Sequence, residues 1–175
     1  MRRAVDLHAL ALSMSLEDFC LRVPYPVLLP VTEAPRSADP EVLALEFSAS
    51  ATRKLLVDRS ALRAMAQAES SRAPVGLRKT QTAFPTMITV GRTANNDIHL
   101  EDPSVSRFHA FFEVKQGVVE LGDAGSSEGT RVAGQRLEPK GALVVVAPGT
   151  TVAFGNSEFI LLSPDMYWHR LNPRK

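Results

Sequence analysis

Hydrophobic and polar positions follow two different patterns along the chain, and the change falls at about residue 75 of 175. Beyond this point, short apolar runs rich in β-branched and aromatic residues alternate with turns that contain glycine. Runs of this kind are typical of antiparallel strands. The pattern predicts strands at residues 86–90, 98–100, 109–114, 118–121, 131–132, 143–146, 151–154 and 158–162. We therefore expect a mainly β domain built as an antiparallel sandwich.

The residues before position 75 are rich in alanine and leucine and carry several prolines. Ser15 and Asp18 have the spacing of a capping box, which predicts that a helix begins at Ser15. Apolar residues at 16, 19, 20 and 23 would form one face of this helix, and Pro24 would end it. The other expected elements are an extended segment at 25–29, a loop at 31–40, a strand at 42–47, a helix at 60–68 and a connector at 70–74.

The C-terminal residues 164–175 are predicted to form a tail or a short helix. Trp168 and Leu171 have helical spacing, which favours packing of this helix against the sandwich.

Composition narrows the classes of function. The net charge is +1, the pI is about 8.0 and the basic residues are scattered, so we expect no nucleic-acid partner. The single cysteine, Cys20, permits no internal disulfide and favours a reducing, cytoplasmic setting. Since no apolar stretch approaches the roughly 20 residues of a membrane span, we expect no membrane association.

The most specific chemistry lies between residues 90 and 109. Gly91-Arg92 follows a predicted strand, and Ser106-Arg107-x-His109 precedes another. An arginine offers a planar fork of charged donors and a serine adds a neutral donor, a combination suited to phosphate. A third segment, residues 123–130, places glycines around small hydroxyl residues, so its loop could expose backbone N–H groups to an anion.

Other chemistries fit these residues less well. Ser106, His109 and Asp123 suggest a hydrolase triad, but no Gly-x-Ser-x-Gly elbow is present, and we expect no enzymatic activity. The histidines are dispersed without paired ligand spacing, so we expect no metal. No Gly-x-x-x-x-Gly-Lys-Ser/Thr loop occurs, and no cofactor is expected. His109 is better explained as a buried imidazole that holds a loop to the sheet.

The ordered set Gly-Arg, Asn-Asp-Ile, Ser-Arg-x-His, Asp-x-Gly-Ser-Ser-x-Gly-Thr and Phe-Gly resembles the forkhead-associated (FHA) domain, of the small bacterial type without an attached enzyme. The resemblance implies an FHA-type β-sandwich at residues 75–163, after a small N-terminal helix and strand extension at 1–74. It implies a phosphopeptide site at Arg92, Ser106, Arg107, Ser127 and Glu128. It further implies that Gly91, His109, Gly129 and Thr130 shape this site, and that Asn96 and Asp97 form the turn before a strand.

Glu128 departs from the family pattern, which usually has asparagine there. An ionised glutamate only accepts hydrogen bonds, whereas asparagine also donates them. Its charge would repel a phosphate that carries about −1.5 to −2 charges. We therefore predict that Glu128→Asn strengthens binding.

The resemblance implies an adaptor that binds a phosphothreonine-containing protein, such as a serine/threonine kinase or its substrate. A diverged FHA fold that binds proteins without phosphate is the alternative. The extension at 1–74 could cover an edge of the sandwich or dock a partner. Autoregulation through a threonine of the chain itself, such as Thr32 beside Glu33, also stays open.

Overall fold

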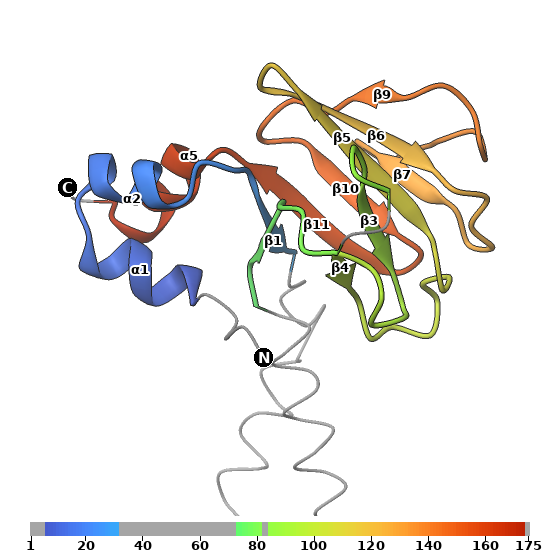
Figure 1. Cartoon of the computed structure of the whole chain (residues 1–175), viewed down its shortest axis with the longest axis horizontal. Helices are drawn as coiled ribbons and strands as arrows, with labels where there is room; N and C mark the ends of the chain where they lie inside the picture. The colour runs from blue at the N-terminus through green and yellow to red at the C-terminus, as the bar shows by residue number, and fades with distance from the viewer. Residues whose placement is uncertain (1–5, 32–72, 82–83, 174–175) are drawn as a thin grey trace, which may run out of the picture.

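The computed structural model describes residues 6–31, 73–81 and 84–173. The strand expected at 42–47 and the helix expected at 60–68 lie outside these residues. The same holds for Thr32, for the loop at 31–40 apart from its first residue, and for most of the connector at 70–74. Figure 1 shows two stacked sheets, with a group of helices beside them.

Two sheets form the sandwich, as expected. One has the order β2 (Val75–Gly76), β1 (Val27–Pro30), β11 (Ser157–Leu162), β10 (Thr151–Phe154), β7 (Thr130–Val132) and β8 (Gln135–Arg136). The other has the order β4 (Ile98–His99), β3 (Ile88–Gly91), β5 (Ala110–Lys115), β6 (Val118–Asp123) and β9 (Val144–Val145). The pair β3–β4 is parallel, which the sequence pattern did not predict; the other strand pairs are antiparallel.

Alternating side chains of the two sheets fill the space between them. Along β5, Ala110 and Phe112 are buried, whereas the residues between and after them are more exposed. The buried ring of Phe154 meets His109, Phe112 and Phe159, with ring centroids about 6 Å apart in each pair. Aromatic side chains bury large apolar areas, so this cluster is a main source of the stability of the sandwich.

The expected strands are present with small shifts at their ends, and β10 has the predicted bounds. The segment expected to be extended at 25–29 contributes β1, which pairs with β11 in register from Val27 opposite Leu162 to Pro30 opposite Phe159. The short strands β2 and β8 were not predicted. The boundaries of the FHA domain at 75 and 163 stay a prediction.

Three helices form a second apolar cluster at one end of the sandwich. They are α1 (Leu7–Ser13), α2 (Leu16–Arg22) and α5 (Pro164–Leu171). Ser15 caps α2 as predicted, because its side chain accepts a hydrogen bond from the Asp18 N–H. Phe19, Tyr167 and Trp168 are buried in this cluster, together with Val27 and Leu162 from the adjoining strands.

The C-terminal helix is present as expected, and it packs on the sandwich through residues of β1 and β11. Tyr167 and Trp168 also pack against α1 and α2. The indole N–H of Trp168 donates to the Met14 carbonyl at 3.1 Å. The helix α1 was not predicted, and it provides the surface that α5 covers.

The helices and the loops that carry the predicted site lie at opposite ends of the sandwich. Strand β11 begins at Ser157, which bonds Asp102 among the site-bearing loops, and it ends at Leu162 in the helix cluster. At about 3.3 Å per residue, this strand separates the two regions by roughly 20 Å.

Candidate functional site

The residues predicted to contact a phosphopeptide lie around one open cleft of about 480 Å³. The loops after β3, between β4 and β5, and between β6 and β7 supply its walls. The lining residues are Arg92, Pro103, Ser104, Val105, Ser106, Arg107, Phe108, Ser127 and Glu128. Three segments that are distant in sequence therefore meet at one place.

Arg92 is exposed, and two hydrogen bonds fix it at the end of β3. Its backbone N–H donates to the Ser106 carbonyl at 3.0 Å, and its side-chain Nε donates to the Val105 carbonyl at 3.1 Å. These bonds hold the guanidinium beside the cleft and use only one of its side-chain nitrogens. The Nη donors can therefore bind an anion in a fork.

Ser106 and Ser127 join two of the loops directly. The Ser106 hydroxyl oxygen accepts a hydrogen bond from the Ser127 N–H at 3.1 Å. This bond uses a lone pair of the oxygen, so the hydroxyl hydrogen can be donated to a ligand. Ser127 itself is exposed at the cleft.

His109 lies beneath these loops and bonds two of them. It is fully buried; its Nδ1 accepts from the Ser106 N–H at 3.0 Å, and its Nε2 lies 3.2 Å from the Gly129 carbonyl. This pattern assigns a neutral ring with the proton on Nε2. Burial lowers the pKa of His109, which favours the same neutral form.

The hydrolase alternative is wrong in its geometry. The histidine ring bonds the backbone of Ser106, not its hydroxyl, and the hydroxyl bonds the Ser127 N–H. A general base has to reach the proton of the nucleophile, and His109 is committed to the backbone on both sides.

Gly91 allows the loop that carries Ser106 and Arg107 to lie against the end of β3. A Cβ at this position would overlap with the Arg107 carbonyl oxygen. That oxygen accepts hydrogen bonds from Thr93 Oγ1 at 2.9 Å and from Asn96 Nδ2 at 2.7 Å. Asn96 is buried, so it acts as a clamp between the two loops that carry the arginines.

Asp123 organises the third loop. Its buried carboxylate accepts from the N–H groups of Gly125 and Ser126 and from the hydroxyls of Ser126 and Thr130. Burial alone raises the pKa of Asp123, but these hydrogen bonds lower it overall, so the group is held ionised. Gly129 has a φ of +85° and offers its carbonyl to His109. Thr130 and Gly129 therefore shape the loop from below, away from the cleft.

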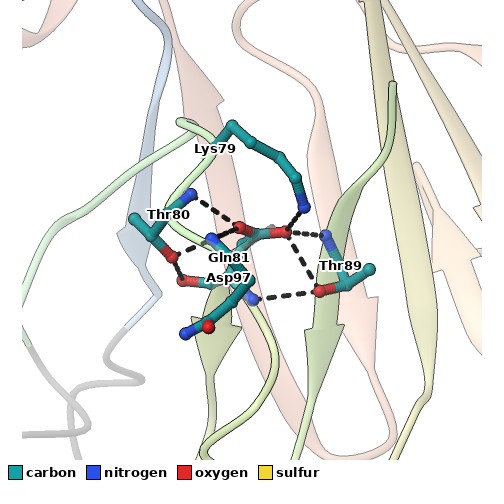
Figure 2. A network of polar contacts seen from close by, with 5 residues as sticks. All are labelled: Lys79, Thr80, Gln81, Thr89 and Asp97. Atoms are coloured by element: carbon teal, nitrogen blue, oxygen red, sulfur yellow. Dashed lines mark hydrogen bonds and ion pairs between the residues drawn. The ribbon is translucent and has the colours of Figure 1, made fainter. Parts of the chain in front are cut away.

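Asp97 joins the segment between β2 and β3 to the β3–β4 turn. Figure 2 shows its carboxylate among Lys79, Thr80, Gln81 and Thr89. Lys79 Nζ lies 2.6 Å from Oδ2, the Thr80 and Gln81 N–H groups each lie 2.6 Å from Oδ1, and the Thr89 N–H lies 2.9 Å from Oδ2. Burial alone raises the pKa of Asp97, but the bonds from these groups lower it well below its usual range.

Glu128 lines the same cleft as Arg92 and Arg107 and is exposed. In the part of the chain that the structure describes, it forms no ion pair with either arginine. The cleft thus presents two cationic side chains and one anionic side chain to any ligand.

Two observations concern residues 6–31, 73–81 and 84–173 alone. No group of at least three histidine, cysteine, aspartate or glutamate side chains there could hold a metal ion. No helix in these ranges is long and apolar enough to cross a bilayer.

Sequence reasoning missed the hydrogen bond from Asn96 to the Arg107 carbonyl and the set of hydrogen bonds that Asp123 accepts. Asp123 carried a signal, because Gly125, Ser126 and Thr130 follow it at spacings suited to a local turn.

Comparison with known proteins agrees with this geometry. Residues 88–155 match the family model of the FHA domain. The oxoglutarate dehydrogenase inhibitor of Corynebacterium glutamicum is 37% identical over 75 residues, which cover 43% of this chain and 50% of that protein. The chain thus spans about half the length of the curated relatives it matches.

Two solved structures are similar to about half of this chain. Mycobacterium tuberculosis EmbR, in complex with a low-affinity phosphopeptide, has a TM-score of 0.45 and 25% identity over 53% of this chain and 22% of that one. The FHA domain of the CT664 protein from Chlamydia trachomatis has a TM-score of 0.44 and 28% identity, covering 52% of this chain and 85% of that one. All residues that line the loop cleft lie within the match to the FHA domain at 88–155, whereas the strands β1, β2 and β11 of the sandwich lie outside it.

Proposed function

We propose that this protein binds phosphothreonine-containing proteins through the cleft at Arg92, Ser106 and Ser127, and that it acts as an adaptor in serine/threonine-kinase signalling. The observation that carries the proposal is the convergence of Arg92 and Ser106. The Arg92 N–H and the Ser106 carbonyl are hydrogen-bonded at 3.0 Å, and both side chains line one cleft.

The chemistry of the cleft suits a phosphate. A phosphothreonine brings about −1.5 to −2 charges and three strong acceptor oxygens. Arg92 offers charged Nη donors, Ser106 offers a hydroxyl, and Arg107 adds a second positive charge at the rim. Charge-assisted hydrogen bonds of this type are about twice as strong as neutral ones.

An adaptor role follows from the type of domain. FHA domains are binding modules rather than enzymes, and we extend this to the whole chain, which we place in the cytoplasm. The partner we propose is a serine/threonine kinase or one of its substrates. The curated relatives are named as inhibitors of oxoglutarate dehydrogenase. Their names thus describe an effect on another protein, which is in keeping with a binding role.

Glu128 favours a second candidate function. Its carboxylate lies in the cleft and weakens the positive field there, which suits a partner recognised without phosphate. In that case the FHA fold would serve as a scaffold, and removing phosphate from the partner would leave the complex intact.

A peptide titration tests the proposal and separates the two candidates. The probes are degenerate peptides centred on threonine or phosphothreonine, measured by calorimetry against the wild-type chain. We expect binding of the phosphorylated set only, and loss of at least about 100-fold in Arg92→Ala, since charged hydrogen bonds contribute about 1.5–3 kcal/mol each.

The matched control is Arg170→Ala, which removes an exposed arginine on α5 at the other end of the sandwich. This variant should bind as the wild type does. Equal binding of both peptide sets would favour the phosphate-independent function, and no binding of either set would contradict the phosphothreonine proposal.

A further inference from the structure

A small hollow lies between edge strands of the two sheets. Its volume is about 180 Å³, and its walls come from β2, from β4 with the residues after it, and from β11. Both β2 and β4 are edge strands. The lining residues are Val75, His99, Leu100, Glu101, Asp102, Ser157 and Phe159. None of these residues lines the phosphate cleft, so the hollow is a separate recess.

Part of the lining is apolar. Leu100 and Phe159 are buried in the core between the sheets, and Val75 packs against the same core. An aliphatic chain in the hollow would therefore exchange water for apolar contacts, which favours binding. A cavity of about 150 Å³ is known to hold a benzene molecule, so this hollow has room for one side chain.

The rest of the lining carries negative charge. Burial alone raises the pKa of Asp102, but hydrogen bonds from Ser157 and Ser104 lower it overall, so its carboxylate is ionised. Glu101 is exposed, and its Oε1 lies 3.9 Å from His99 Nδ1. Among the residues that the structure describes, no lysine or arginine forms an ion pair with either carboxylate.

The hydrogen bonds of Asp102 restrict which cation fits. Its Oδ1 accepts from the N–H and the hydroxyl of Ser104 at 2.8 and 2.7 Å, and its Oδ2 accepts from the Ser157 hydroxyl at 2.5 Å. One lone pair of Oδ2 remains, and the Ser157 oxygen can still accept a bond. A guanidinium fork prefers both oxygens of one carboxylate, whereas a compact ammonium can donate singly to several acceptors.

We propose that this hollow binds a lysine side chain of a protein partner. The aliphatic part of the lysine packs on Leu100 and Phe159, and its ammonium donates to Asp102, Ser157 and Glu101. An edge strand such as β4 can also pair with an extended segment, which would bring the lysine to the hollow. No phosphate takes part, so the site is independent of the proposed function and gives the protein a second contact surface.

The test uses three unphosphorylated pentapeptides and the full chain. Each peptide has threonine at both ends and valine on either side of a central residue, which is lysine, norleucine or arginine. Norleucine keeps the aliphatic chain of lysine and lacks its charge. Titrations followed by amide chemical shifts give both the affinity and the place of binding. The proteins are the wild type, Glu101→Gln and the control Glu17→Gln.

We expect the lysine peptide to shift the amide signals of residues 99–102 and of Ser157. It should bind at least about tenfold more tightly than the norleucine peptide, since charge-assisted hydrogen bonds are lost with the ammonium. It should also bind more tightly than the arginine peptide. Glu101→Gln should weaken the lysine peptide by about tenfold at low salt and less at high salt. Glu17→Gln, an exposed position on α2, should bind as the wild type does.

Four outcomes would overturn the lysine site. Equal affinity of the lysine and norleucine peptides would mean that the hollow takes an apolar side chain. An arginine peptide that binds as tightly as the lysine peptide would contradict the choice of cation. Binding that leaves the signals of residues 99–102 unchanged would place the contact elsewhere. A dimer in sedimentation that Glu101→Gln dissociates, without peptide binding, would assign the hollow to a second copy of the chain.

Discussion

The carbonyl oxygen of Arg107 occupies the space where a residue other than glycine at position 91 would place its first side-chain carbon. Gly91 ends β3, and Arg107 lies in the loop before β5, so this close approach brings two walls of the cleft together. Because Gly91 has no side chain, the loop with Arg107 can lie against the end of β3, next to Arg92.

The first prediction concerns this close approach. Gly91→Ala should lower the free energy of unfolding by about 1–3 kcal/mol, because the backbone at Arg107 has to move. It should also weaken phosphothreonine-peptide binding by at least about tenfold. Chemical denaturation and calorimetry measure the two effects.

The control for Gly91 is Gly117→Ala in the β5–β6 turn. Gly117 has a φ of +81°, and a Cβ there would meet no atom within 4 Å. This variant should lose stability through backbone strain alone and keep its affinity. Wild-type affinity in Gly91→Ala would contradict the role given to this glycine.

The second prediction concerns pH. Burial lowers the pKa of His109, so the folded state holds the neutral ring at pH values where the unfolded state binds a proton. The stabilising contribution is complete above the unfolded pKa of about 6.5 and is lost as the pH falls below it. The free energy of unfolding should therefore decrease more steeply from pH 7 to pH 5 in the wild type than in His109→Gln.

Denaturant titrations at each pH measure this difference. The glutamine variant still offers a donor to the Gly129 carbonyl and an acceptor to the Ser106 N–H, so it should fold. Equal slopes in the two proteins would show that protonation of His109 is not coupled to unfolding.

The third prediction concerns the carboxylate shown in Figure 2. Asp97→Asn removes the ion pair with Lys79 and places an amide donor among groups that donate, so it should cost about 2–4 kcal/mol of stability. Because these contacts lower the pKa of Asp97, its contribution in the wild type is present above about pH 3.9 and is lost as the pH falls further.

Thermal unfolding of Asp97→Asn beside Asp165→Asn checks this prediction. Asp165 is exposed in the first turn of α5, so its substitution should have a small effect. Similar melting temperatures of the two variants would mean that the carboxylate contributes little to holding residues 79–81.

The fourth prediction concerns charge in the cleft. Glu128→Asn should tighten phosphothreonine binding by about tenfold at low salt, because it removes a like charge near the phosphate. The gain should shrink as salt screens the repulsion. The control is Glu158→Gln, which removes the charge of an exposed side chain on β11 and should leave the affinity unaltered. A salt-independent gain, or none, would contradict the electrostatic explanation.

Most strands of the sandwich were predictable from patterns of residues that are close together in the sequence. The strands that end in glycine turns were predictable because turn chemistry and alternation both act within a few residues. Strand β8, Gln135–Arg136, is exposed and polar, and only its pairing with β7 makes it a strand. Helix α1 did carry a signal, since Asp6 caps it and Leu7, Leu10 and Ala11 share a face.

The candidate site was predictable from its family pattern, whereas its supports depend on distant contacts. Asp97 bonds residues 16 to 18 positions earlier, and nothing near it in the sequence indicates that segment. The stacking of Phe84 on Phe108 also joins separate segments. Hydrophobic periodicity detects residues that face a core, and an exposed aromatic pair leaves no such trace.

The helix cluster bears on how binding to this protein can be measured. Asp6 and Pro173, the first and last residues described by the structure, adjoin α1 and α5 at the end of the sandwich away from the cleft. A chip linker or a fluorescent label attached near either residue would leave the loops facing the solution. For surface-based kinetics or energy-transfer assays, the protein can therefore be attached or labelled at its helical end, and the ligand can still approach the cleft.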